Sequence, residues 1–230
     1  MARMPRLVVP GYAHHVTQRG NRRQRTFWRN QDYRSYIQFL ADAAKEAEAA
    51  VWAYCLMPNH VHVIIVPNLR NSLAAAFRIA HRRYTCHINL RQKWVGHLWQ
   101  GRFHSTVMDE SHLLTAVRYV LMNPVRAALC GSPFDWPWSS ASAHLHGVDD
   151  ALVTVGPMSH RVSNWSEYLR SAPADDDYDD IRRNSRTGRP LGDAAFVEKL
   201  ELETGRRLKP RRPGRPAAGR GDGLPNISNS

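Results

Sequence analysis

The sequence predicts an α+β fold in which helices pack on one face of an antiparallel sheet, followed by a basic C-terminal extension. Short apolar runs that end at turn residues are typical of strands, and longer runs with apolar residues every three or four positions are typical of helices. These runs follow one another as strand, helix, strand, strand, helix, strand, helix. Hydrophobic residues make up 43% of the chain, which suits one core of ordinary size.

The first strand is expected over residues 12–18, where apolar and polar residues alternate before a turn. A basic loop follows over residues 22–29. A helix is expected over residues 30–50, with Asn30 or Asp32 as its cap. Its apolar positions recur at helical spacing and are Tyr36, Phe39, Leu40, Ala43 and Ala47.

A hairpin of two buried strands is expected next. Residues 51–56 and 61–66 are short runs rich in β-branched and other apolar residues, and a turn containing Pro58 separates them. A second helix is expected over residues 72–90. Its apolar face consists of Leu73, Ala76, Phe77, Ala80, Tyr84 and Ile88.

The last strand is expected over residues 98–108, and Asp109 resembles the cap of a third helix. The apolar face of that helix consists of Leu113, Val117, Val120 and Leu121. This order of elements suits the ferredoxin-like or RRM-like plan, in which helices pack on one face of the sheet. The opposite face is then expected to be free to bind a strand of nucleic acid.

We expect one folded unit over residues 1–147. Residues 148–190 are expected to form an irregular extension, first acidic and then basic, and the five aspartates within 175–180 are interpreted as a solvated loop. Residues 191–230 are expected to hold one short helix over 194–204 and a basic tail. The tail is too rich in proline, glycine and arginine to fold alone.

The charge of the chain indicates a polyanionic partner. The formal net charge is +12 and the isoelectric point is about 10.2, and such a protein gains free energy by releasing the counterions condensed on nucleic acid. The absence of a long apolar run argues against a membrane partner. Cys55, Cys86 and Cys130 form no C-x-x-C pair, so neither a disulfide framework nor a thiolate zinc site is indicated, and the cytoplasm fits best.

Two histidines, His60 and His62, stand where the second strand of the hairpin begins. Side chains two residues apart on a strand share a face, so both imidazoles can contact one cation. The alternative is a structural role in a half-buried strand. A second pair, His144 and His146, lies in a stretch without an apolar strand, and we interpret it as structural or solvent-exposed.

Tyr119 and Asn123 are four residues apart, so a continuous helix places them on one flank. A hydroxyl and an amide oxygen are then presented together. Two alternatives stay open. Tyr119 can be a core tyrosine, and Asn123 can cap a short helix whose first residue is Pro124.

Several short motifs occur together: His60-Val61-His62, Tyr119-x-x-x-Asn123, Gln18-Arg19-Gly20-Asn21, Trp99-Gln100-Gly101-Arg102-Phe103 and Asn123-Pro124-Val125-Arg126. Their combination resembles the single-tyrosine HUH transposases, also called IS200-like. Within this family the best match is the group of REP-associated tyrosine transposases. The resemblance covers about residues 8–147. Each motif alone has little specificity, whereas the combination is specific.

The resemblance implies that His60, His62 and the side-chain oxygen of Asn123 hold a divalent cation and that Tyr119 attacks a phosphodiester. Many relatives in the wider superfamily have glutamine in place of Asn123, so the details of coordination stay open. Mg²⁺ or Mn²⁺ is favoured, because phosphate oxygen is a hard ligand and no thiolate is nearby. The expected product is a covalent 5′-phosphotyrosine, which a 3′-hydroxyl can reverse without a nucleotide cofactor.

The expected partner is single-stranded or hairpin DNA. Candidate contacts to the DNA are Arg19, Arg22, Arg23, Arg25, Arg82, Arg83, Gln100, Arg102 and Arg126. Candidates for stacking on unpaired bases are Trp94, Trp99, Trp136 and Trp138, of which roughly two are expected to belong to the core.

A nucleic-acid binding module without catalysis is the main alternative. It predicts a metal-independent, salt-dependent affinity that survives Tyr119→Phe. A histidine-based phosphoesterase is disfavoured. Such an enzyme needs a second well-placed histidine pair with a hydroxyl partner, whereas here the apolar residues Val63 and Ile64 follow His62. The sequence leaves open whether the protein is a monomer or a homodimer.

Overall fold

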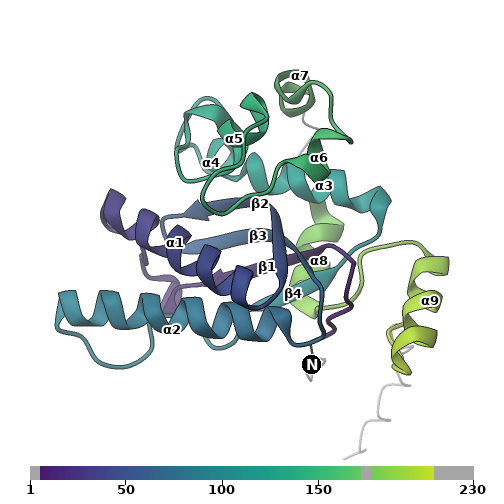
Figure 1. The fold of residues 1–230 in the computed structure, drawn as a ribbon, viewed down its shortest axis with the longest axis horizontal. Helices are drawn as coiled ribbons and strands as arrows, with labels where there is room; N and C mark the ends of the chain where they lie inside the picture. The colour runs from purple at the N-terminus through teal and green to yellow at the C-terminus, as the bar shows by residue number, and fades with distance from the viewer. Residues whose placement is uncertain (1–5, 172–177, 210–230) are drawn as a thin grey trace, which may run out of the picture.

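A four-stranded antiparallel sheet lies at the centre of the computed structural model, which describes residues 6–171 and 178–209 (Figure 1). The strand order is β2-β3-β1-β4. The strands are β1 (His14–Arg19), β2 (Ala49–Met57), β3 (His60–Pro67) and β4 (His104–Val107). The helices that alternate with them are α1 (Asn30–Glu46), α2 (Ser72–Gln92) and α3 (Glu110–Leu121). The predicted α+β, ferredoxin-like fold is confirmed.

Helices α1 and α2 lie side by side over one face of the sheet (Figure 1). Because side chains alternate along a strand, β3 directs Val61, Val63 and Ile65 into the core beneath these helices. Tyr36 of α1 and Phe77 of α2 are fully buried in the same core. The amphipathic spacing that predicts both helices therefore matches the face that each one buries.

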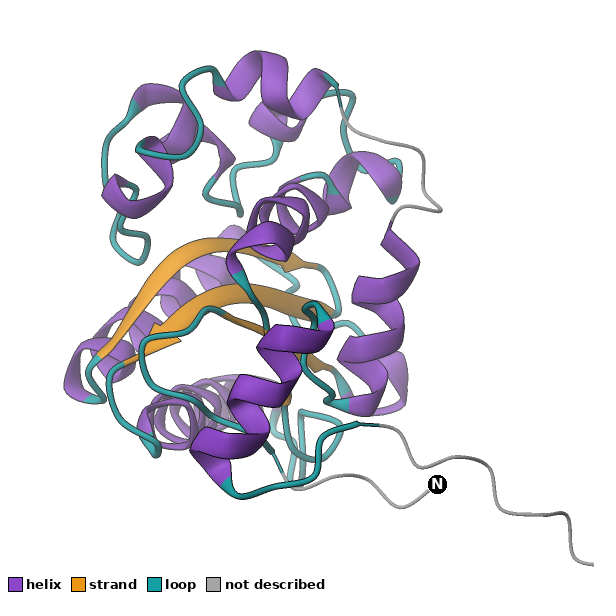
Figure 2. Cartoon of the chain, turned by 90° about the vertical axis from the view of Figure 1, so that its right-hand side faces the viewer, coloured by secondary structure: helices purple, strands orange, loops and turns teal. Residues whose placement is uncertain are grey.

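The expectation that the second face of the sheet is free is met only in part, because helices also pack on that face (Figure 2). Helix α3 packs its apolar stripe on β2 and β3, where Cys55 and Ile64 are fully buried. Helix α8 (Asp179–Thr187) lies against β4 and β1, and Thr106 Oγ1 donates a hydrogen bond to the Asn184 carbonyl at 3.1 Å. Helix α3 packs there because this face of β2 and β3 is apolar, and its burial removes that surface from water.

The last strand is shorter than the predicted span of 98–108, because β4 begins only at His104. Trp99 makes an isolated bridge to Gly20, and Gly101 has a φ of +61°, which breaks the extended path. Residues 98–103 thus form a loop that is docked on the end of β1 rather than a continuation of β4.

Short helices fill the remainder of the described chain: η1 (Asn21–Arg23), α4 (Asn123–Arg126), η2 (Pro133–Asp135), α5 (Ala141–His146), α6 (Gly156–Ser159), α7 (Trp165–Arg170) and α9 (Ala194–Thr204). The extension over 148–190 is less irregular than expected, since it contains α6, α7 and α8. These helices have too few turns to produce a clear apolar period.

The helix predicted over 194–204 is confirmed as α9, and Asp193 caps it by accepting the Phe196 N–H at 2.7 Å. The predicted basic tail from residue 210 onward and aspartates 175–177 lie outside the described residues. Within 6–171 and 178–209, no helix combines the length and apolarity that a bilayer span requires.

Candidate active site

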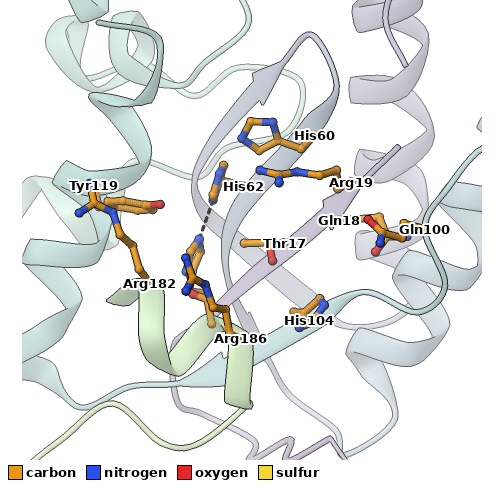
Figure 3. A pocket seen from close by; sticks show the side chains of 12 residues that line it. Thr17, Gln18, Arg19, His60, His62, Gln100, His104, Tyr119, Arg182 and Arg186 are labelled. Atoms are coloured by element: carbon orange, nitrogen blue, oxygen red, sulfur yellow. Dashed lines mark hydrogen bonds between the residues drawn. The ribbon is translucent and has the colours of Figure 1, made fainter. Parts of the chain in front are cut away.

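Strand β3 presents His60 and His62 on one face of the sheet, as their spacing predicts (Figure 3). The register pairs His62 with Thr17 of β1 and pairs Ile64 with His15. His15 therefore stands on the same face as His62 and diagonal to it. The sheet brings a third imidazole, which the sequence analysis did not select, next to the pair on β3.

A pocket of about 450 Å³ opens over this face of the sheet (Figure 3). The residues that line it are His15, Thr17, Gln18, Arg19, His60, His62, Gln100, His104, Tyr119, Arg182, Ser185 and Arg186. They come from β1, β3 and β4, from the loop before β4, and from α3 and α8. One pocket thus combines imidazoles, a phenol and guanidinium groups, which are groups that bind cations and phosphates.

The hydrogen bonds of the two predicted ligands constrain their tautomers. His60 Nδ1 lies 2.6 Å from Asn59 Oδ1, an acceptor, so Nδ1 carries the proton and Nε2 has the lone pair. Asn59 Nδ2 donates to the Arg23 carbonyl at 3.0 Å, which fixes the orientation of the amide. His62 Nδ1 lies 2.8 Å from His15 Nε2, so its Nδ1 is also engaged. Nε2 is therefore the lone-pair nitrogen of His60, and in His62 it is the ring nitrogen that takes no part in the hydrogen bond to His15.

Burial keeps these imidazoles uncharged. It lowers the pKa of His15 to about 4. Burial, with the positive charge of Arg19, lowers the pKa of His60 to about 3, and it places the pKa of His62 well below the usual value. At neutral pH the histidines are therefore neutral bases with lone pairs available for coordination.

Tyr119 reaches this pocket from α3, and its side chain is only 9% exposed. The centre of its ring lies 5.6 Å from that of His62 and 5.9 Å from that of His15, with the rings close to perpendicular. The guanidinium carbon of Arg126 lies 4.4 Å from the centre of the Tyr119 ring. Tyr119 is therefore buried like a core tyrosine and also lines the pocket of the histidines.

Asn123 lies one turn beyond Tyr119. Its Nδ2 donates to the Tyr119 carbonyl at 2.9 Å, which leaves Oδ1 as the acceptor oxygen. The alternative role as a cap is not seen, because α4 begins at Asn123 itself and Met122 occupies the capping position. Asn123 is buried and is not among the residues that line the pocket.

The predicted ligands, two neutral imidazoles and one amide oxygen, are of types that divalent cations such as Mg²⁺ and Mn²⁺ can accept. Among the described residues, no three His, Cys, Asp or Glu side chains form a cluster that could bind a metal. The third predicted ligand, Asn123, does not line the pocket of the two histidines.

The predicted DNA contacts divide into three groups. Arg19 and Gln100 line the pocket of the histidines, and Arg126 lies over Tyr119. Arg82 lines a neighbouring pocket of about 500 Å³, which shares Gln18 with the first one. The third group lies on the surface.

In that third group, Arg22 and Arg23 are exposed in η1, and Arg102 is exposed in the loop before β4. Arg25 is exposed, and its Nε donates to the Phe27 carbonyl at 2.5 Å. Arg83 lies 3.9 Å from Asp42. None of these five arginines lines either of the two pockets.

Pocket residues that the sequence analysis missed are His15, Thr17, His104, Arg182, Ser185 and Arg186. The two arginines belong to α8, in a segment that sequence periodicity does not mark as helical. His15 follows His14 in a strand, and only the register decides which of the two faces the pocket. His14 faces the opposite core, where its Nδ1 bonds to the Tyr12 carbonyl at 2.8 Å.

The tryptophans are mostly fixed by packing. Trp99 is 7% exposed, and Trp138 stacks on Tyr33 with ring centres 4.6 Å apart. Trp136 Nε1 donates to the Leu56 carbonyl at 3.1 Å. Trp94 is 44% exposed and is the one of the four that is most accessible to a base.

The second histidine pair has no place in the pocket. His144 is buried against Trp165, with ring centres 4.3 Å apart, and His146 is exposed and bonds to the Ser142 carbonyl. The interpretation of this pair as structural or solvent-exposed agrees with this packing.

Comparison with known proteins identifies similar chains. No curated protein matches the chain. A solved structure of a REP-associated tyrosine transposase bound to a REP hairpin is similar at 19% identity, covers 67% of this chain and 92% of its own, and has a TM-score of 0.56. A candidate transposase from Deinococcus radiodurans R1 is similar at 18% identity, covers 53% and 97% of the two chains, and has a TM-score of 0.38.

The family comparison covers the part of the chain that holds the sheet and the pocket histidines. The family model described as "Transposase IS200 like" matches residues 8–123, which is half of the chain and extends from the loop before β1 to Asn123. The first similar structure shares the fold of this region. The chain belongs to the IS200-like transposase family.

Proposed function

We propose that this chain cuts and rejoins single-stranded DNA beside a palindromic hairpin, through a covalent 5′-phosphotyrosine on Tyr119. The observation that carries the proposal is the pocket that Tyr119 shares with His60 and His62. Membership of the IS200-like transposase family supports the reaction class. The similar transposase bound to a REP hairpin supports a hairpin as the partner. The free cysteines fit a cytoplasmic site of action.

In this proposal a divalent cation, Mg²⁺ or Mn²⁺, would be held by His60, His62 and the side-chain oxygen of Asn123. When bound, it would stabilise the charge that builds up on the non-bridging phosphate oxygens. Arg19 and Arg186 line the pocket and add positive charge for the DNA backbone. The histidines are neutral because they are buried, so they need no deprotonation before binding.

Tyr119 gives up its phenol proton to water or a nearby base as its oxygen attacks phosphorus, so that the bond between phosphorus and tyrosine forms and the bond between phosphorus and the 3′ oxygen breaks. The departing 3′ oxygen takes up one proton in turn and leaves as a hydroxyl, so the proton count is unchanged. The guanidinium of Arg126 lies over the Tyr119 ring and adds positive charge beside the reacting group. A 3′-hydroxyl that attacks the phosphotyrosine reverses these steps, so one tyrosine serves both cutting and joining.

The test is incubation of the full chain with labelled single-stranded DNA that carries palindromic hairpins, with Mn²⁺ or with EDTA. A denaturing gel then resolves protein-linked DNA. We expect a metal-dependent adduct that is lost in Tyr119→Phe and retained in Tyr12→Phe. Tyr12 is a matched control, because its hydroxyl lies 3.5 Å from Glu203, outside the pocket.

His60→Ala and His62→Ala are expected to abolish the adduct while hairpin binding persists. His146→Ala, which removes an exposed imidazole, is expected to leave both unchanged. Hairpin binding that is independent of metal, with no adduct from any hairpin, would replace the proposal with a non-catalytic binding module.

A further inference from the structure

We propose that His15 is a positioning residue for His62. In this proposal His15 Nε2 accepts the proton on His62 Nδ1, fixes that tautomer, and keeps the lone pair of His62 on Nε2, where a cation can bind. The role of the cation rests on the proposed function. The tautomer is a property of the chain without metal or DNA, so it can be tested separately.

The geometry of the pair is tight. His15 Nε2 and His62 Nδ1 are 2.8 Å apart, and the two rings are nearly parallel, with an interplanar angle of 11°. The side chains are 2% and 6% exposed, so water has little access to either nitrogen. At this distance one proton lies between two nitrogens, and it belongs to only one of them.

The other end of the His15 ring has a partner that is compatible with this direction. His15 Nδ1 lies 3.1 Å from Ser185 Oγ of α8, and a hydroxyl can accept a proton or donate one; in the proposed arrangement it accepts the proton of Nδ1. With that proton on Nδ1, neutral His15 has its lone pair on Nε2. The hydrogen bonds then run in one sense, from His62 to His15 and from His15 to Ser185.

His60 provides an internal comparison. Its Nδ1 faces Asn59 Oδ1, which can only accept, so His60 has the Nδ1–H tautomer. His62 points its Nδ1 at His15 in the corresponding way. The two ligands thus each have an acceptor at Nδ1, and the acceptors come from different elements: the turn before β3 for His60, and β1 for His62. The opposite proton placement would leave N–H on His62 Nε2 and remove its lone pair from the site.

Two amide substitutions separate this role from simple packing. The amide of glutamine at position 15 reaches about as far from the backbone as Nε2 of histidine, whereas that of asparagine reaches only as far as Nδ1. His15→Gln therefore keeps an acceptor for His62. His15→Asn keeps only the contact toward Ser185, and His15→Ala keeps neither. His14→Ala is the matched control, because His14 is equally buried on the same strand and faces the opposite core.

The first measurement is ¹⁵N NMR of the histidine rings in the metal-free chain. We expect the Nδ1–H tautomer at His62 in the wild type and in His15→Gln, and loss of that preference in His15→Asn and His15→Ala. An Nε2–H tautomer at His62 in the wild type would overturn the proposal, whatever the variants do.

The second measurement is Mn²⁺ affinity by electron paramagnetic resonance of the free ion. We expect about 10-fold to 100-fold weaker binding in His15→Ala and His15→Asn. The wild-type affinity is expected in His15→Gln and His14→Ala. Equal affinity in the wild type and His15→Ala, or equal loss in His14→Ala, would refute positioning by His15 while leaving the Tyr119 adduct assay unaffected.

Discussion

The buried carboxylate of Asp32 joins the start of α1 to the end of α2. Asp32 is fully buried in the first turn of α1, where it accepts the N–H groups of Trp28 and Arg29 at 2.9 and 3.0 Å. Arg91, at the end of α2, donates to both of its oxygens. Asp32 thus ties the basic loop before α1 to the helix that carries Arg82.

We expect Asp32→Ala to lower the free energy of unfolding by about 1.5–3 kcal/mol, the usual contribution of hydrogen bonds to a charged group, because Arg91, the partner that remains, is 23% exposed and can turn toward water. The cost includes a lost helix cap, which alone is worth about 1 kcal/mol. Asp42→Ala, on the same helix, is the matched control. The Asp42–Arg83 pair is 3.9 Å apart with side chains 44% and 41% exposed, so its loss should cost less than about 1 kcal/mol.

Asp32→Asn separates charge from capping. The amide oxygen can still accept the backbone N–H groups, whereas the ion pair with Arg91 is lost. Arg91 is 23% exposed and can turn toward water, so we expect a cost between those of the two alanine variants.

The assay is urea unfolding followed by circular dichroism at pH 7. Burial raises the pKa of Asp32, but the bonds from Arg91 and the two N–H groups outweigh it, and the net pKa lies below the usual value. Its stabilising contribution is then complete above the pKa of the unfolded state and is lost only as the pH falls through the folded pKa. Equal costs for Asp32→Ala and Asp42→Ala would refute the reasoning.

Three further predictions follow from other contacts. Six buried or half-buried histidines have a lowered pKa. The unfolded chain therefore binds more protons than the folded one below about pH 6.5, and the urea midpoint should fall by the equivalent of several kcal/mol from pH 7.5 to pH 5.5; a midpoint that does not move would contradict this. These histidines are His14, His15, His60, His62, His81 and His144. Gly20→Ala places a Cβ 2.3 Å from the Gln24 carbonyl oxygen, whereas Gly131→Ala meets open space, so thermal unfolding should show a loss of stability in the first variant only. Arg22→Ala, at an exposed site, should lower the slope of log hairpin affinity against log salt by about 1, measured by fluorescence anisotropy, and an unchanged slope would exclude a phosphate contact there.

The sequence by itself determined the features that depend on local periodicity. The positions of α1, α2, α3 and α9 follow from apolar residues at helical spacing, and Asp109 and Asp193 are caps whose partners lie three residues away. His60 and His62 share a face because side chains on any strand alternate. These relations span a few residues, so the chain needs no distant contact to specify them.

Only the tertiary structure decided which residues surround that histidine pair. His15 meets His62 across 47 positions of sequence, and it does so because the β1–β3 register, rather than either strand alone, sets the diagonal neighbour. Ser185 reaches His15 across 170 positions, because α8 returns to cover β4 and β1. A contact between distant segments depends on how apolar faces are buried together, and no local pattern encodes that choice.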